Sequence, residues 1–327
     1  MATDAFRPIG SLEGHTEPVY SVAWAPDGRT IATAGLDDTV RLWDASTRKE
    51  IRKYEGHTKI VTAVAIAPDG KSILSGSGDN SARLWAYPGT EPAKENPEAK
   101  AKAKANAKAN PAPPGLIRTF SGHSAGLYGV AYHPDGQRIA TCASDKTARI
   151  WDLAKGIQIR SITAHAAIVY GIAFAPKGEI LASSGDDKLI KLWKADDGKE
   201  VRKIEGHEAP VYAIAYRPDG KAMASGSSDR TVRIWNPEDG KGLHKLEGHT
   251  GDVYSVAWSR DGRWLASVDN AGILIVWDAS TGKPAGRHRI ASRVLTYSVA
   301  WSPDGSTLAV AGSDTKTHLL IVHFPAG

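Results

Sequence analysis

The stretch GHTEPVYSVAWAPDGRTIATAGLDDTVRLWD, residues 14–44, is the first copy of a unit that returns along the chain. The tryptophan near its end recurs, each time after an apolar residue, at Trp43, Trp85, Trp151, Trp193, Trp235 and Trp277. The spacing is 42 residues except for one interval of 66, so one unit carries 24 additional residues (66 − 42 = 24). A seventh, looser copy covers about residues 292–323. A repeat of this length is typical of stacked or radially arranged units.

Each unit has the pattern of a small β-sheet. In residues 211–235, VYAIAYR alternates, Pro218-Asp219-Gly220 forms a turn, and KAMASGSS and TVRIW follow as two further strands. A fourth strand precedes each histidine, as in VRKIEGH at residues 201–207. Four short strands cannot bury two apolar faces alone, whereas seven such sheets packed around an axis can.

The pair Gly-His followed by Trp-Asp, at the spacing seen in residues 14–44, resembles the WD-repeat family over nearly the whole chain. The resemblance implies an all-β fold, a seven-bladed β-propeller of four-stranded antiparallel blades, in a single domain of residues 1–327. In that family each repeat begins with the outer strand of a blade. We therefore expect residues 8–12 to pair into blade 7 and to close the ring without a covalent link.

Each of the first five repeats also contains Ser or Thr, His and Asp, which are the residue types of a hydrolase triad. The five sets are His15/Thr33/Asp37/Trp43, His57/Ser75/Asp79/Trp85, His123/Thr141/Asp145/Trp151, His165/Ser183/Asp187/Trp193 and His207/Ser225/Asp229/Trp235. An active site has little reason to occur five times with a tryptophan attached each time. The resemblance implies instead a structural tetrad, because a buried indole N–H and a buried hydroxyl need hydrogen-bond partners.

The last two repeats depart from this pattern. Blade 6 has Ala271 where the aspartate is expected, so we expect its tetrad to lack a carboxylate. Blade 7 has Ser292, Val310 and His323 at the histidine, hydroxyl and tryptophan positions. We expect the region where the ring closes to be its least stable part.

A tyrosine follows five residues after the histidine position in six of the seven repeats. The seven residues are Tyr20, Thr62, Tyr128, Tyr170, Tyr212, Tyr254 and Tyr297, and those two positions earlier are Pro18, Ile60, Gly126, Ile168, Pro210, Asp252 and Leu295. The resemblance implies that the tyrosine position opens the innermost strand, at the top mouth of the central channel. We expect a peptide or protein partner, including one with a basic side chain, to bind the seven mouth residues together with Ile60, Ile168, Asp252 and Leu295. The alternative is that the rings simply fill their own channel.

The additional residues lie within 86–115, AYPGTEPAKENPEAKAKAKANAKANPAPPG, between the third and fourth strands of blade 2. This segment of Ala, Lys, Asn, Glu and Pro has no apolar periodicity and predicts a flexible low-complexity loop. An alternative function for the loop is a tether for acidic partners or nucleic acid.

Composition excludes several classes of protein. The formal net charge is +5 and the lysines are scattered outside the loop, so a nucleic-acid partner is not favoured. Cys142 is the only cysteine, which rules out an intramolecular disulfide and a cysteine-based metal site. No apolar run has the length of a membrane span, and the first residues lack the apolar core of a secretory signal, so a cytoplasmic protein without a membrane partner is expected.

These observations favour a non-catalytic interaction scaffold, monomeric by itself or a subunit of a larger complex. We expect no cofactor, metal or catalytic residue, because no unrepeated reactive cluster stands out; His318 with His323 is an incidental pair. The alternatives are a hydrolase or other enzyme with its site at the central channel, and a nucleic-acid-associated module that uses the Lys/Ala loop.

Overall fold

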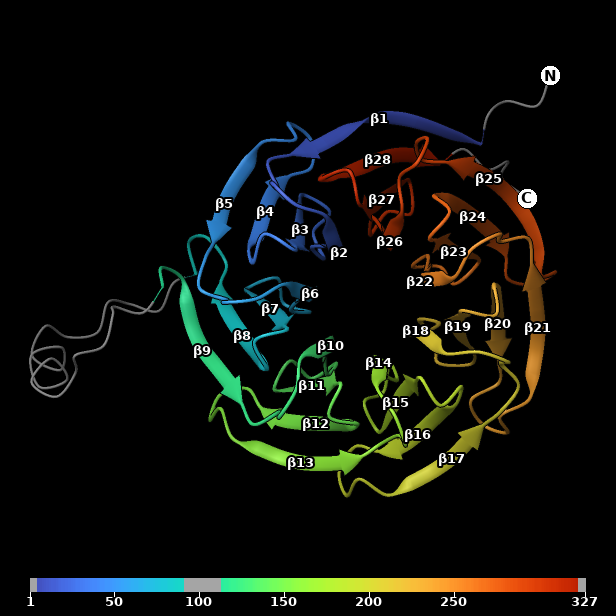
Figure 1. The fold of residues 1–327 in the computed structure, drawn as a ribbon, viewed down its shortest axis with the longest axis horizontal. Helices are drawn as coiled ribbons and strands as arrows, with labels where there is room; N and C mark the ends of the chain where they lie inside the picture. The colour runs from blue at the N-terminus through green and yellow to red at the C-terminus, as the bar shows by residue number, and fades with distance from the viewer. Residues whose placement is uncertain (1–4, 91–112, 323–327) are drawn as a thin grey trace, which may run out of the picture.

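The computed structural model describes residues 5–90 and 113–322. Within these residues every regular element is a strand, and the strands form seven four-stranded antiparallel sheets. Figure 1 shows the sheets arranged radially, as blades, around a central axis. The innermost strands encircle this axis and the outermost strands form the circumference. The predicted seven-bladed propeller is confirmed.

The blades are numbered in chain order. Blade 1 contains β2 (Val19–Trp24), β3 (Thr30–Gly35), β4 (Val40–Asp44) and β5 (Glu50–Tyr54). Blade 2 contains β6 (Val61–Ile66), β7 (Ser72–Ser77), β8 (Ser81–Ala86) and β9 (Leu116–Ser121). Blade 3 contains β10 (Leu127–Tyr132), β11 (Arg138–Ala143), β12 (Thr147–Asp152) and β13 (Gln158–Thr163). Blade 4 contains β14 (Val169–Phe174), β15 (Ile180–Gly185), β16 (Ile190–Lys194) and β17 (Glu200–Ile204).

The remaining blades have the same order from the axis outward. Blade 5 contains β18 (Val211–Tyr216), β19 (Met223–Ser227), β20 (Thr231–Trp235) and β21 (Gly242–Glu247). Blade 6 contains β22 (Val253–Trp258), β23 (Trp264–Asp269), β24 (Ile273–Asp278) and β25 (Lys283–Arg289). Blade 7 contains β26 (Thr296–Trp301), β27 (Thr307–Gly312), β28 (Lys316–Val322) and β1 (Phe6–Glu13).

The N-terminal strand closes the ring. Strand β1 pairs antiparallel with β28 from Phe6↔Val322 to Glu13↔Lys316, so the predicted pairing of residues 8–12 is confirmed and extends further at both ends. Phe6 and Leu12 are each 2% exposed. Because these side chains are buried against blades 6 and 7 and blades 7 and 1 respectively, the closure rests on apolar packing as well as on backbone pairing.

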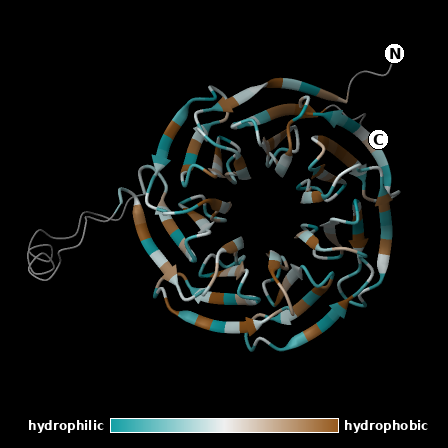
Figure 2. Ribbon diagram, in the orientation of Figure 1, coloured by the Kyte–Doolittle hydropathy of each residue, from teal (hydrophilic) through white to brown (hydrophobic). Residues whose placement is uncertain are grey.

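The hydrophobic core lies between blades rather than within them. In one cluster, Val40, Leu42 and Tyr54 of blade 1 pack against Val61 and Trp85 of blade 2. Figure 2 shows the complementary pattern at the circumference, where apolar and polar residues alternate along the outermost strands. Each blade therefore needs its neighbours to bury its apolar faces, which is why the repeat forms a closed ring.

The predicted loop at 86–115 lies between β8 and β9 of blade 2. These two strands pair with each other as the third and fourth strands of the other blades do. The amide of Ala86 donates to the carbonyl of Gly115 at 2.7 Å, and Trp85 pairs with Leu116. Residues 91–112, which make up most of the predicted loop, lie outside the described residues. None of the described residues forms a helix long and apolar enough to cross a membrane.

Candidate functional site

The His, Ser or Thr, Asp and Trp side chains of blades 1–5 form hydrogen-bonded tetrads. In blade 1, the Trp43 indole donates to Thr33 Oγ1 at 2.8 Å, and this hydroxyl lies 2.7 Å from His15 Nε2. The other ring nitrogen, His15 Nδ1, lies 2.9 Å from Asp37 Oδ2. The same contacts recur in the sets His57/Ser75/Asp79/Trp85, His123/Thr141/Asp145/Trp151, His165/Ser183/Asp187/Trp193 and His207/Ser225/Asp229/Trp235.

The aspartate of blade 4 has fewer hydrogen-bond partners than its equivalents in the other four blades. Asp187 Oδ1 lies 2.7 Å from His165 Nδ1, and the amide of Ala166 donates to Asp187 Oδ2 at 3.1 Å. Leu189, however, stands two positions after Asp187, where the other four blades carry a hydroxyl that donates to the aspartate. Those hydroxyls belong to Thr39, Ser81, Thr147 and Thr231. The side chain of Asp187 is also 13% exposed, against 8% or less for its equivalents. No hydroxyl therefore donates a hydrogen bond to Asp187, whereas one does so to each of its four equivalents.

The hydroxyl groups of the tetrads are closed off from solvent. The hydroxyl-bearing residues Thr33, Ser75, Thr141, Ser183 and Ser225 are all 0% exposed, so no substrate reaches a nucleophile there. Burial lowers the pKa of His57, against the opposing effect of Asp79. Burial opposes ionisation of Asp79, yet hydrogen bonds from His57 and Ser81 hold the pKa of Asp79 below its usual range. The arrangement is a neutral histidine held by a charged aspartate.

The expectation that blade 6 lacks a carboxylate is wrong. Asp269 Oδ2 lies 2.9 Å from His249 Nδ1, while Ser267 accepts a hydrogen bond from the Trp277 indole at 2.8 Å. Asp269 is the last residue of β23, two positions before Ala271, and is 0% exposed. Gly35 holds the equivalent position in blade 1, and a Cβ added there would lie 3.2 Å from His15 Nδ1. A side chain at this position therefore points at the histidine, so the carboxylate reaches it from another place in the sequence.

Blade 7 replaces the tetrad with apolar packing. Val310, at the hydroxyl position, is 0% exposed and packs with Val299, Leu308 and Leu320. Ser292 precedes β26, and His323 lies outside the described residues. His318 Nε2 lies 2.8 Å from Asp314 Oδ2 rather than forming a site of its own.

A β-bulge occurs in the innermost strand of every blade, at the tyrosine position. Strand β2 shifts register between Val19 and Ser21, which leaves Tyr20 without a partner residue in β3. The same shift occurs at Thr62, Tyr128, Tyr170, Tyr212, Tyr254 and Tyr297. Bulges re-aim side chains. The sequence pattern identified the tyrosines but gave no indication of the bulges that hold them.

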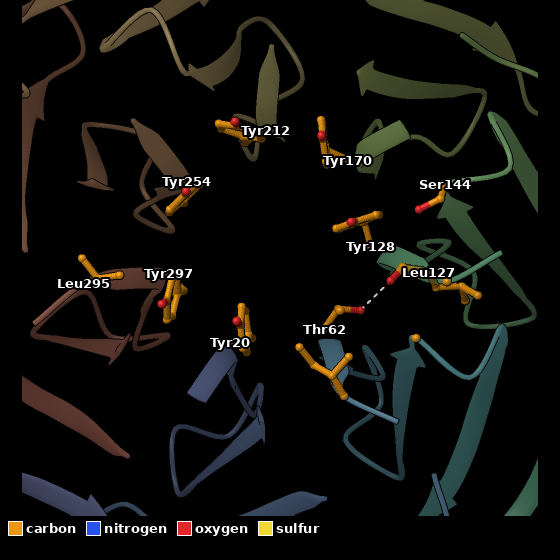
Figure 3. Close-up of a pocket in the computed structure, with 13 residues that line it drawn as sticks. Tyr20, Thr62, Leu127, Tyr128, Ser144, Tyr170, Tyr212, Tyr254, Leu295 and Tyr297 are labelled. Atoms are coloured by element: carbon orange, nitrogen blue, oxygen red, sulfur yellow. Dashed lines mark hydrogen bonds between the residues drawn. The ribbon is translucent and has the colours of Figure 1, made fainter. Parts of the chain in front are cut away.

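The six tyrosine rings form an arc around the top mouth of the channel (Figure 3). Tyr170 lies between Tyr128 and Tyr212, with ring centroids 5.0 and 4.9 Å away. The arc continues through Tyr254 and Tyr297, and Tyr297 stacks on Tyr20. Such edge-to-face and stacked contacts are favourable for aromatic rings, so each ring helps to hold its neighbours in place.

The arc surrounds a cavity of about 540 Å³, so the rings do not fill their channel. The predicted mouth residues that line the cavity are Tyr20, Ile60, Thr62, Tyr128, Tyr170, Tyr212, Tyr254, Leu295 and Tyr297. Ile168 and Asp252 are half-buried in the top loops and do not line it. The lining also includes Gly78, Leu127 and Ser144, which the sequence did not single out. Gly78 and Ser144 come from loops between the second and third strands, and the sequence offered no signal that these loops reach the mouth.

The comparisons with known proteins agree with this architecture. The family model described as "WD domain, G-beta repeat" matches residues 6–44, 48–86 and 115–152, and the model described as "IFT122 first beta-propeller" matches residues 168–320. The chain belongs to the WD-repeat family.

Similar WD-repeat chains align with this one mostly over about one repeat. The COMPASS component SWD1 of Saccharomyces cerevisiae is 46% identical over 57 residues, which is 15% of this chain and 13% of the relative. The nuclear distribution protein nudF 2 of Penicillium rubens is 26% identical over 147 residues, 45% of this chain and 31% of the relative. The probable cytosolic iron-sulfur protein assembly protein CIAO1 homolog of Chlamydomonas reinhardtii is 49% identical over 37 residues, 11% of this chain and 10% of the relative. The matched segments thus span less than a third of these relatives' length.

Electrostatics distinguish one side of the mouth of this WD-repeat propeller. Burial, with the nearby carboxylate of Asp186, raises the pKa of Tyr170, whose hydroxyl donates to Asp186 Oδ1 at 3.4 Å. Burial, with the carboxylates of Asp252 and Asp186, also raises the pKa of Tyr212. The phenols therefore stay neutral hydrogen-bond donors on this side of the mouth. Within the described residues, no group of three His, Cys, Asp or Glu side chains could hold a metal ion.

Proposed function

We propose that this chain is a non-catalytic interaction scaffold that binds a peptide or protein segment at the tyrosine-lined mouth. The observation that carries the proposal is the cavity of about 540 Å³ bordered by six tyrosines, a volume within the range of ligand-binding pockets. Tyrosine gives a large contact area, few rotatable bonds and one polar group, and it is enriched among binding hot spots.

Two further observations support this proposal. WD-repeat propellers are generally non-catalytic scaffolds, and two of the relatives are by name a COMPASS component and a probable iron-sulfur protein assembly protein homolog. The described residues that line the cavity are Tyr, Thr, Ser, Gly, Ile and Leu, which offer no acid–base pair. These features favour binding over the alternative of an enzyme at the channel.

The test is a screen for peptides that bind the intact chain, followed by affinity measurement on a triple variant. Tyr170→Ala, Tyr212→Ala and Tyr254→Ala together are expected to weaken binding of the selected peptides by about 100-fold or more. The matched control is Ile51→Ala, Val201→Ala and Leu243→Ala, which removes three exposed apolar side chains from outermost strands. Peptides that bind the triple tyrosine variant as tightly as the wild type would place the site elsewhere on the molecule.

A further inference from the structure

The tyrosine arc has one opening, at blade 2. Thr62 holds the tyrosine position there, and its hydroxyl donates to the backbone carbonyls of Leu127 at 2.7 Å and Gly76 at 3.1 Å (Figure 3). The side chain is thereby tied to the strands beside it. Ring contacts among the described residues run from Tyr128 around to Tyr20, and none joins these two across Thr62.

Two glycines line the mouth at the boundary between blades 2 and 3. Gly78 and Gly126 both line the cavity, and a Cβ added to Gly126 would lie 3.1 Å from the Cα of Gly78. Neither residue has φ in the left-handed region, so the backbone does not require glycine at either position. We call the surface formed by Thr62, Gly78 and Gly126 the glycine gap.

The other six blade boundaries carry at least one side chain beyond Cβ at these positions. Their residue pairs are Leu36/Ile60, Ser144/Ile168, Asp186/Pro210, Ser228/Asp252, Asn270/Leu295 and Ser313/Pro18. Those boundaries accommodate larger residues, whereas here a Cβ on Gly126 would crowd the backbone of Gly78. Because neither glycine places a side chain on the rim, the gap is suited to a main chain that crosses the rim there.

The opposite side of the mouth is suited to a positive charge. Asp186 accepts the Tyr170 hydroxyl at 3.4 Å, Asp252 lies two positions before Tyr254, and within the described residues neither carboxylate forms an ion pair. No Lys or Arg is among the described residues that line the cavity. Faces of tyrosine rings attract cations, and an unpaired carboxylate beside them adds to that attraction.

We propose that the partner is a linear peptide that places a lysine or arginine side chain against Tyr170 and Tyr212, and whose backbone leaves the mouth across the glycine gap. This inference rests on the proposed function, since it specifies the ligand of the same mouth. Blades 2 and 5 lie across the opening from one another, so the peptide spans the mouth from Tyr212 to Thr62 (Figure 3).

The experiment uses two libraries of short linear peptides, one with a fixed central arginine and one with glutamine in its place. The intact wild-type chain is expected to bind the arginine peptides about tenfold more tightly or better, with affinity that falls as salt rises. Equal binding of the two libraries would overturn the assignment of a cation.

The gap is tested with Gly78→Ser combined with Gly126→Ile, which introduces residues that other blades carry at the same positions. This variant is expected to bind the selected arginine peptides about tenfold more weakly. The matched control is Pro18→Ile, which introduces isoleucine at the Gly126-equivalent position of another boundary and is expected to bind as the wild type does. If the double variant does not fold, Gly78→Ser alone serves, because the two atoms nearest to its Cβ are side-chain atoms, Ile60 Cγ2 at 3.0 Å and Lys59 Cβ at 3.6 Å.

The two proposals fail in different ways. If the glycine-gap variant keeps wild-type affinity while the triple tyrosine variant loses it, the path across the gap is wrong and the mouth remains the binding site. If the triple tyrosine variant also keeps wild-type affinity, both proposals fall.

Discussion

Tyr20 and Tyr297 stack with ring centroids 4.6 Å apart and ring planes 12° apart, although they come from blades 1 and 7, near opposite ends of the chain. The contact crosses the boundary at which β1 closes the ring. The continuity of the tyrosine arc therefore depends on a non-covalent closure, and several properties of the mouth are linked to the stability of the fold.

Deleting residues 1–13 is expected to lower the melting temperature by roughly 10 °C, because it removes the buried side chains of Phe6 and Leu12 together with all pairing to β28. Peptide binding at the mouth is expected to weaken in parallel. Thermal unfolding followed by circular dichroism measures the effect, and deletion of residues 1–4 alone is the control. Equal melting temperatures for the two deletions would mean that β1 contributes nothing to closure.

Asp269→Ala is expected to destabilise the chain by about 3 kcal/mol, because it leaves His249 and four backbone amides without their carboxylate partner. Asp252→Ala, which removes a carboxylate from a half-buried top loop, is the control and is expected to change stability far less. Urea denaturation measures both. Similar midpoints for the two variants would show that blade 6 does not depend on its tetrad.

Stability is expected to fall as the solution becomes acidic, in two stages. Burial lowers the pKa of His57, His123, His165 and His207 below that in the unfolded chain, so only the unfolded state gains protons as pH drops below about 6.5. The aspartates titrate next. Against the opposing effect of burial, hydrogen bonds from His249 and from backbone amides lower the pKa of Asp269 to about 2, so its contribution is present above about pH 4 and is lost as pH falls toward 2.

Urea midpoints between about pH 7 and pH 3 test this expectation. His207→Gln removes one of the four groups and is expected to make the pH dependence between about pH 6.5 and pH 5 shallower. A midpoint that rises on acidification would contradict the assigned direction of the histidine shifts.

Replacing residues 91–112 with a short Gly/Ser linker, which keeps the buried Ala86 and the Tyr87 side chain that bonds Thr30, is expected to change the melting temperature by no more than about 2 °C. The reason is that β8 and β9 already pair next to the Ala86–Gly115 hydrogen bond, as β16 and β17 pair in blade 4. Differential scanning calorimetry checks stability. Binding of single-stranded RNA, measured before and after the replacement, tests the tether: a loss confined to the shortened chain would support a nucleic-acid role for the loop.

Much of the fold could be predicted from the sequence because most repeats carry a histidine near their start and a tryptophan near their end. The constant spacing of Trp43, Trp85 and their equivalents predicted the blades, and the resemblance to the WD-repeat family, in which each repeat begins with an outer strand, predicted the closure. The role of Asp269 could not be found this way, since a carboxylate two positions from its usual place reaches the same histidine only through the geometry of the strand end. The glycine gap was also hidden, because Gly78 and Gly126 come from different repeats and only the radial arrangement brings them together.

Because of the bulge, Tyr20 and its six equivalents line up at the mouth without having a partner residue in the neighbouring strand. A residue with no cross-strand partner can be exchanged without disturbing the ladder around it, as the threonine of blade 2 already illustrates. Under the proposed function, the mouth residue of one blade can therefore change while the ladder of that blade is kept, so ligand preference can evolve one blade at a time.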